Sequence, residues 1–175
     1  MLMNKYNQKG IGMMEVLVAL LILAIGVLGF TALQLRAVDA TDEAMSKIQA
    51  MNLARDLAER IRVNRTAFST YGDNLNATTQ STTATPECIQ TTNTTPCTTS
   101  VQMANYDTAQ VVSQANNLGM TIRLPDCQVS GTQNRKCVYV AWGKTKAINS
   151  STDSDACTNG GAYLPQAKCV IMELY

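Results

Sequence analysis

Six cysteines carry the most evident chemistry of this 175-residue chain, and all of them lie in its second half. They are Cys88, Cys97, Cys127, Cys137, Cys157 and Cys169. An even number of cysteines is typical of disulfides in an oxidising compartment. Fifteen pairings are open to six cysteines. The short spacing between successive cysteines suggests three local loops, Cys88 with Cys97, Cys127 with Cys137 and Cys157 with Cys169.

The residue types present exclude or weaken several other kinds of site. The chain has no histidine, so nucleophilic catalysis through a histidine is excluded, and without a CxxC pair a zinc site has no support. The G-x-S-x-G motif and phosphate-binding glycine loops are absent. Composition leaves a serine and lysine dyad or a carboxylate pair open, but no local motif indicates either. We therefore expect a protein that is not an enzyme and that uses no cofactor and no metal.

One oxygen-rich cluster, Asp153, Asp155 and Asn159, lies in the stretch 149–164, which we predict to be a loop. Calcium binds such side chains, but the EF-hand spacing is incomplete and the closing glutamate is missing. A solvated loop is therefore the favoured interpretation of this cluster.

A single carboxylate, Glu15, stands at the start of the longest apolar stretch, which runs without interruption from Val16 to Leu33. At about 1.5 Å per residue, a helix of this length just crosses a hydrocarbon core of about 30 Å. A carboxylate inside a membrane costs roughly 2.5–3.5 kcal/mol, so it usually has a partner and a function. The nearest positive side chain, Lys9, lies outside the run. Glu15 therefore either rests at the headgroup level or pairs with a group from elsewhere.

The sequence from Gly10 to Glu15, GIGMME, followed by the apolar run, resembles the class III signal of type IV pilins and pseudopilins. In that family a membrane peptidase cuts after the glycine and methylates the new amino terminus, and the apolar helix becomes the core of a filament. The resemblance implies cleavage after Gly10, methylation of Ile11, and pairing of Glu15 with such a terminus when subunits dock. A charge pair in a medium of low dielectric constant is strong enough to set the axial register of the subunits.

Several departures from the family pattern favour a minor pilin over a major one. Ile11 replaces the usual phenylalanine, Gly12 and Met13 replace threonine and leucine, and no proline precedes Pro86. The GMMEVLVALLIL signature and an AWG after a predicted strand resemble minor pilins of the PilV kind. The implied function is pilus assembly or priming, and through it twitching motility, adhesion and DNA uptake. The alternatives are a minor pseudopilin of a type II secretion system and a membrane-anchored adhesin that uses the Thr-rich loop.

The elements that position these groups begin with one long helix, predicted from Ile11 to Arg65. Its first half is apolar all round, and its second half carries one apolar stripe that should pack on a globular head. The stripe consists of Ala50, Leu53, Ala54, Leu57 and Ile61. The opposite face is charged and is expected to be solvated; it consists of Arg55, Asp56, Glu59, Arg60 and Arg62.

The rest of the chain predicts a head with a small sheet. Residues 71–74 should end the helix, and the segment Thr78 to Ser100, where thirteen of 23 residues are Ser or Thr, should be a loop. A short helix is predicted over 105–118. Alternating apolar residues predict strands over 120–124, 138–142 and 170–174. The expected fold class is α+β, with a long N-terminal helix packed on a small antiparallel β-sheet head held by disulfides, which is the type IV pilin fold.

We expect four parts along the chain: a leader over 1–10, a membrane-spanning and filament-core helix over 11–35, the amphipathic half of that helix over 36–65, and a periplasmic or extracellular head over 66–175. Lys5 and Lys9 precede the apolar run, so the positive-inside rule places the leader in the cytoplasm. The resemblance implies a subunit held in the bacterial inner membrane before assembly and on the cell surface afterwards. Net charge near zero, +1, does not favour nucleic acid as a direct ligand.

The implied partners follow from the resemblance. They are other major and minor pilins, bound through the N-terminal helix, the prepilin peptidase, and the inner-membrane assembly machinery. No small-molecule substrate is expected.

Cleavage and disulfide formation are tested together by the intact mass of the protein, measured with and without reduction. We expect a mature chain that begins at Ile11, carries one methyl group, and gains two hydrogens for each of three disulfides on reduction. Replacing Gly10 with a bulky residue should leave the ten leader residues attached. An unchanged mature mass in that variant would place the cleavage site elsewhere.

Overall fold

One long helix, α1 (Met13–Val63), opens the computed structural model, which describes residues 12–89, 96–128 and 135–174. The predicted long helix is thus confirmed within the described residues; Ile11 lies outside them. Helical backbone ends at Asn64, whose φ of −117° and ψ of 51° are not helical. A 3₁₀ turn, η1 (Arg65–Ala67), follows directly.

The chain divides into two compact units, Met1–Ala44 and Met45–Tyr175. In the first unit, every described residue up to Asp42 is exposed, including the large apolar side chains. In the part of the chain that the structure describes, α1 is the one helix long and apolar enough to cross a membrane. Its first half therefore presents apolar surface that this unit does not itself cover.

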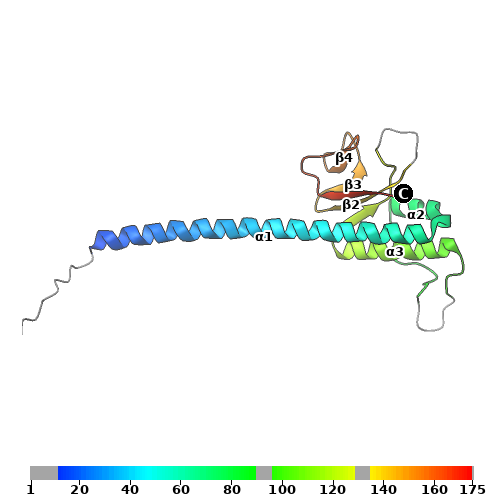
Figure 1. Ribbon diagram of the computed structural model, residues 1–175, viewed down its shortest axis with the longest axis horizontal. Coiled ribbons are helices and arrows are strands. Elements are labelled where there is room, and N and C mark those ends of the chain that lie inside the picture. The colour runs from blue at the N-terminus through cyan, green and yellow to red at the C-terminus, as the bar shows by residue number, and fades with distance from the viewer. Residues whose placement is uncertain (1–11, 90–95, 129–134, 175) are drawn as a thin grey trace, which may run out of the picture. The chain divides into compact units, whose positions relative to one another are not determined.

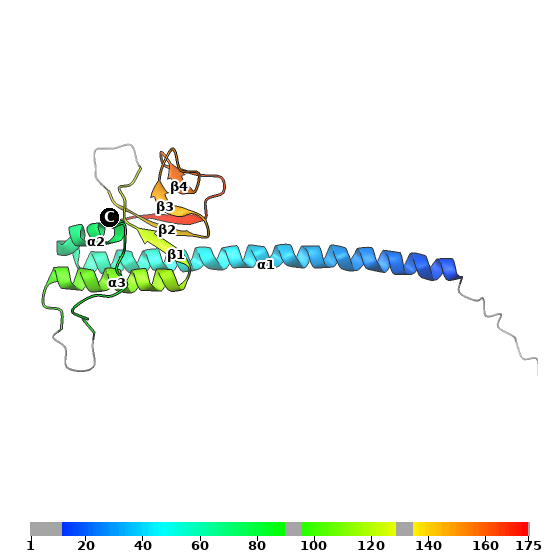
Figure 2. The same cartoon turned by 180° about the vertical axis from the view of Figure 1, so that it is seen from behind.

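In the second unit, the apolar stripe of α1 is buried. Ala50, Leu53, Ala54, Leu57 and Ile61 are each at most 5% exposed, as the helical spacing predicts. They join one hydrophobic core with side chains from the other helices and from a β-sheet. Figures 1 and 2 show α3 (Ser100–Asn117) lying alongside the last part of α1. The stripe is thus the surface on which the head is built.

Helix α2 (Phe68–Asn76) corrects the prediction that residues 71–74 end helical structure. Gly72, Asp73 and Asn74 have low helix propensity. However, Tyr71 and Leu75 on the same helix are fully buried in the core, and this tertiary packing outweighs propensity. The break that the sequence suggested here occurs earlier, at Asn64.

Helix α3 begins five residues before the predicted Asn105, at Ser100, because a capping box defines its start. The Thr99 hydroxyl accepts a hydrogen bond from the Gln102 backbone N–H at 3.2 Å, and the Gln102 side chain accepts one from the Thr99 N–H at 3.3 Å. This exchange satisfies two backbone donors that the first turn of a helix leaves unpaired.

The three predicted strands are confirmed as β1 (Met120–Arg123), β2 (Cys137–Trp142) and β6 (Cys169–Glu173). They form an antiparallel sheet in the order β1-β2-β6. Its register places Ile122, Val140 and Val170 side by side, and all three are buried in the core that contains the α1 stripe. After β2, Gly143 takes a φ of +68°, which allows the chain to turn.

A second sheet corrects the prediction of a loop over 149–164. It contains β3 (Lys146–Asn149), β4 (Ala156–Asn159) and β5 (Ala162–Tyr163), with β3 and β4 parallel. Strand β2 is buried on both faces, and Cys157 helps to cover its outer face in a second apolar cluster. The Tyr139 hydroxyl and the Thr158 hydroxyl also lie 3.2 Å apart. This burial, which the local pattern does not reveal, stabilises the short strands.

Three disulfides tie the head together, and they join the cysteines in the local order that the spacing suggests. Cys88 is bonded to Cys97, Cys127 to Cys137, and Cys157 to Cys169. The second and third attach a preceding loop and strand β4 to the central sheet. Closing such loops lowers the entropy of the unfolded chain.

Leu57→Ala should lower the free energy of unfolding of the head by about 2–5 kcal/mol, because it leaves a cavity at a fully buried position of the stripe. Val63→Ala is the matched control on the same helix. Val63 is 89% exposed, so its change should stay within about 0.5 kcal/mol. Urea unfolding of both variants measures the difference, and equal effects would contradict the packing described above.

Candidate functional site

Glu15 lies in the first turn of α1, where its backbone N–H donates to the Gly12 carbonyl at 2.9 Å. A carboxylate there is favoured by the positive end of the helix dipole. Among the described residues, Glu15 has no cationic partner. The two residues predicted to take part in cleavage and methylation, Gly10 and Ile11, lie outside the described residues. In the part of the chain that the structure describes, Glu15 is thus a carboxylate next to an apolar surface, without a cation paired to it.

The apolar segment that follows Glu15 is fully exposed along its length. Leu17, Leu21, Leu28 and Leu35 are each more than 60% exposed. A contiguous apolar surface of this size in water is unfavourable and marks contact with a membrane or with other proteins. The chemistry of this half of the helix is therefore association.

In the head, a polar network joins the three helices at the C-terminal end of α1. The buried Asp107 carboxylate on α3 accepts hydrogen bonds from Arg60 of α1 at 2.7 Å and from the Tyr71 hydroxyl of α2 at 2.5 Å. The Asn64 amide donates to the Ser100 carbonyl at 2.8 Å. Burial, reinforced by the neighbouring Asp107 carboxylate, raises the pKa of Tyr71 well above its ordinary value. The phenol therefore stays protonated and keeps donating to Asp107.

This network partly corrects the prediction of a solvated charged face on α1. Arg55, Glu59 and Arg62 are exposed, but Arg60 bridges Asp56 on its own helix and Asp107 on α3. The sequence offered no signal for this contact, because Arg60 and Asp107 are 47 residues apart and neither belongs to a recognisable motif.

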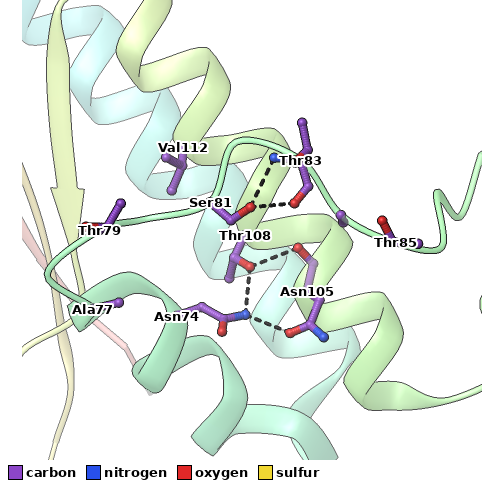
Figure 3. Close-up of a pocket in the computed structure, with 10 residues that line it drawn as sticks. Asn74, Ala77, Thr79, Ser81, Thr83, Thr85, Asn105, Thr108 and Val112 are labelled. Atoms are coloured by element: carbon purple, nitrogen blue, oxygen red, sulfur yellow. Dashed lines mark hydrogen bonds between the residues drawn. The ribbon is translucent and has the colours of Figure 1, made fainter.

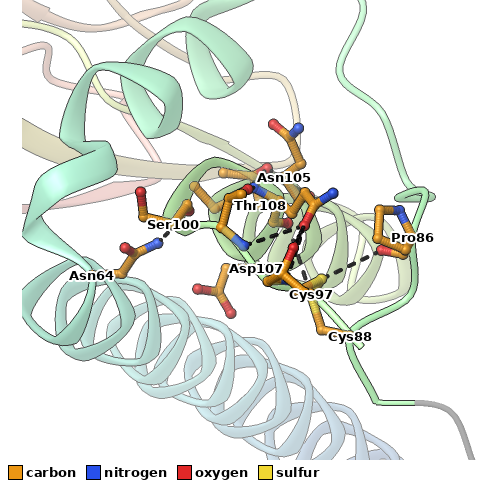
Figure 4. Close-up of a disulfide and its surroundings, with 12 residues drawn as sticks. Asn64, Pro86, Cys88, Cys97, Ser100, Asn105, Asp107 and Thr108 are labelled. Atoms are coloured by element: carbon orange, nitrogen blue, oxygen red, sulfur yellow. Dashed lines mark hydrogen bonds between the residues drawn. A yellow bond between two sulfur atoms is a disulfide. The ribbon is translucent and has the colours of Figure 1, made fainter. Parts of the chain in front are cut away.

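The Thr-rich segment is held to the start of α3 by the Cys88–Cys97 disulfide (Figure 4). The Thr98 and Thr99 backbone N–H groups both donate to the Gln102 side chain. The disulfide therefore adds a covalent link where the segment has few apolar side chains to bury. Residues 90–95 of the segment lie outside the described residues.

A small polar pocket of about 280 Å³ lies between α2, α3 and the start of the Thr-rich segment (Figure 3). The Asn74 amide donates to Asn105 at 2.8 Å and to the Thr108 hydroxyl at 3.0 Å, and Thr108 itself donates to the Ala104 carbonyl. Among the described residues, no acid, base or cation lines the pocket. Its polar groups bond mainly to one another, so the arrangement joins the two helices and provides no catalytic group.

The oxygen-rich cluster is not assembled as a set of metal ligands in the part of the chain that the structure describes. The Asp153 carboxylate accepts a hydrogen bond from Lys146 Nζ at 2.7 Å and another from the Asp155 backbone N–H at 2.9 Å. The bond from Lys146 lowers the pKa of Asp153, and the same bond raises the pKa of Lys146. Across the described residues, no three His, Cys, Asp or Glu side chains lie close enough to hold a metal ion. Asp153 instead closes the loop between β3 and β4.

A long helix with an exposed apolar first half and a disulfide-bonded head on its second half defines the α+β fold of type IV pilins. Comparison with protein families supports the same class. Residues 32–109 match the family "Type IV pilin Tt1218", and residues 5–31 match the prokaryotic N-terminal methylation motif. No curated protein and no solved structure matches the chain. Residues 32–109 are therefore similar to a type IV pilin domain, and they follow a segment that is similar to the prepilin methylation motif.

Asp107→Asn should lower the free energy of unfolding of the head by about 1.5–3 kcal/mol, because it removes the charge on which Arg60 and Tyr71 converge. Glu59→Gln is the control, since Glu59 pairs with Arg62 at 3.5 Å while both side chains are about two-thirds exposed. That exposed pair should contribute less than about 1 kcal/mol. Thermal unfolding of the two variants provides the comparison, and a neutral Asp107→Asn would show that the network does not stabilise the head.

Proposed function

We propose that this chain is a minor pilin of the PilV kind, a subunit that takes part in the assembly or priming of a type IV pilus. The observation that supports this proposal most strongly is that the two halves of α1 have different surfaces. Its first half exposes apolar side chains on every side behind one carboxylate, Glu15, and its second half buries one stripe in a head. A helix of this design is suited to storage in a membrane and to packing among similar helices in a filament.

Along the chain, the proposal assigns residues 1–10 to a leader that the prepilin peptidase removes after Gly10. Residue 11 becomes the methylated amino terminus, 11–35 span the membrane or fill the filament core, 36–65 complete the helix, and 66–175 form the periplasmic or extracellular head. The match of residues 5–31 to the methylation motif supports this division. The partners are other pilins, the peptidase and the inner-membrane assembly machinery.

Glu15 is the proposed assembly residue. Next to apolar surroundings its charge is costly when alone and strongly attracted to a cation. The methylated amino terminus of a neighbouring subunit supplies a cation at the same level of the helix. Pairing of the two groups therefore stabilises the incoming subunit at one axial position. At other axial positions Glu15 stays unpaired, which is unfavourable.

Glu15→Ala should be inserted and cleaved normally, yet its content in sheared pili should fall at least about tenfold, which corresponds to about 1.4 kcal/mol of lost docking energy. Leu17→Ala is the control, because Leu17 is an exposed apolar residue two positions away and the change leaves the charge in place. Immunoblots of sheared pili and of membranes measure both. Wild-type levels of Glu15→Ala in pili would contradict the assembly role.

Deletion of the gene separates this function from the related one. Loss of twitching motility or of surface pili supports a pilus subunit. Accumulation of unsecreted enzymes in the periplasm, with normal piliation, would instead assign the chain to a type II secretion system.

A further inference from the structure

A groove of about 300 Å³ runs along the head between the end of α1 and strand β6. Its floor is apolar and is formed by Ile61, Met172 and Leu174. Its rim carries the exposed Arg55, Glu59 and Arg62 of α1 and Arg65 of the turn η1. Glu173 lines the β6 side, where it pairs with Arg135. The groove thus combines apolar contact area with charges that, from Glu59 onward along the chain, have the order negative, positive, positive.

The complementary row occurs earlier on the same helix. Arg36, Asp39 and Asp42 are exposed and have the order positive, negative, negative. Successive members of both rows are three residues apart. This spacing makes Arg36, Asp39 and Asp42 neighbours on the surface of α1, and likewise Glu59 and Arg62. Arg65 lies beyond the end of α1, in η1, and lines the same groove. Two copies of the chain offset by 23 residues would bring Arg36 to Glu59, Asp39 to Arg62 and Asp42 to Arg65.

The order of charges selects both orientation and register. In a parallel arrangement all three pairs are opposite in sign. In an antiparallel arrangement centred on Asp39 and Arg62, Arg36 meets Arg65 and Asp42 meets Glu59, so two pairs repel. A shift of three residues in either direction brings Asp39 to Glu59 or Arg36 to Arg62, again with like charges opposed.

We propose that the groove is a docking surface for a second copy of this chain, which enters in parallel with its Arg36–Asp42 segment against Glu59, Arg62 and Arg65. The inference rests on the proposed function, because a shared membrane orientation makes the helices parallel. The offset of 23 residues makes this neighbour a different one from the subunit whose amino terminus pairs with Glu15. Charge complementarity along the rows identifies the occupant. The pair that Arg62 makes with Glu59 in its own chain is exposed and 3.5 Å long, so it costs little to exchange for the intermolecular pair.

The test uses the full-length chain in detergent, in two versions with different affinity tags, and measures association by co-purification. Arg62→Glu in both copies, or Asp39→Arg in both copies, should weaken association at least about tenfold, because each places like charges at the centre of the register. Mixing one copy of each variant should restore association. The unchanged Arg36–Asp42 segment of the Arg62→Glu copy then meets the unchanged groove of the Asp39→Arg copy, and in the other possible interface the two changed positions also carry opposite charges. High salt should weaken the wild-type pair.

Two controls separate register from general charge. Lys144→Glu makes the same kind of change at an exposed position outside the groove and should leave association unchanged. Arg55→Glu changes the charge of the groove itself, but position 55 lies opposite Ala32 in this register. Its effect should therefore be clearly smaller than that of Arg62→Glu.

Restored association in the mixed pair supports the proposal. Three results would each overturn the proposal: an equal loss of association for Arg55→Glu and Arg62→Glu, no rescue in the mixed pair, or no self-association of the wild-type chain. The last result would point to a different pilin as the occupant. Circular dichroism of each variant verifies the fold. The assay requires no filament, so a chain that pairs in this register but never enters pili would contradict the proposed function alone.

Discussion

The head depends on the burial of one stripe of α1 against the antiparallel sheet. Leu53, Leu57 and Ile61 meet side chains such as Val140 and Val170 from strands that are far away in sequence. Removing this apolar surface from water contributes roughly 25 cal/mol per Å², the main favourable term in folding. Because the stripe belongs to the same helix as the exposed apolar segment, any force on that segment reaches the head through continuous helical backbone.

Around the stripe, the head uses covalent and polar links where apolar area is scarce. The Thr-rich segment is closed by the Cys88–Cys97 disulfide, and strand β4 is linked to β6 by Cys157–Cys169. Asp107 joins three helices through Arg60 and Tyr71. Such links hold the shape of a head whose loops are polar and bury little apolar surface.

The two halves of α1 explain how one chain can serve in two surroundings. The apolar half gains little by folding alone, since none of its described residues before Glu43 is covered in its own unit. In the proposed function, lipid or neighbouring helices cover this surface. Apolar contact alone does not distinguish one axial position from another, so the proposals assign that selection to charges: Glu15 at the start of the helix, and the complementary rows at Arg36–Asp42 and at Glu59–Arg65.

The sequence alone determined the long helix, its buried stripe, the three main strands and the candidate assembly carboxylate, because each rests on local periodicity or on one unusual residue in a uniform run. The short spacing between successive cysteines also suggested the three disulfide pairs. Only the tertiary structure decided the rest. Helix α2 forms across Gly72 because Tyr71 and Leu75 are buried, and β4 forms because it covers the outer face of β2. Arg60 leaves the solvated face because Asp107, 47 residues away, lies within hydrogen-bonding distance. In each case the deciding contact is non-local, and local pattern carries no information about which distant residues will meet.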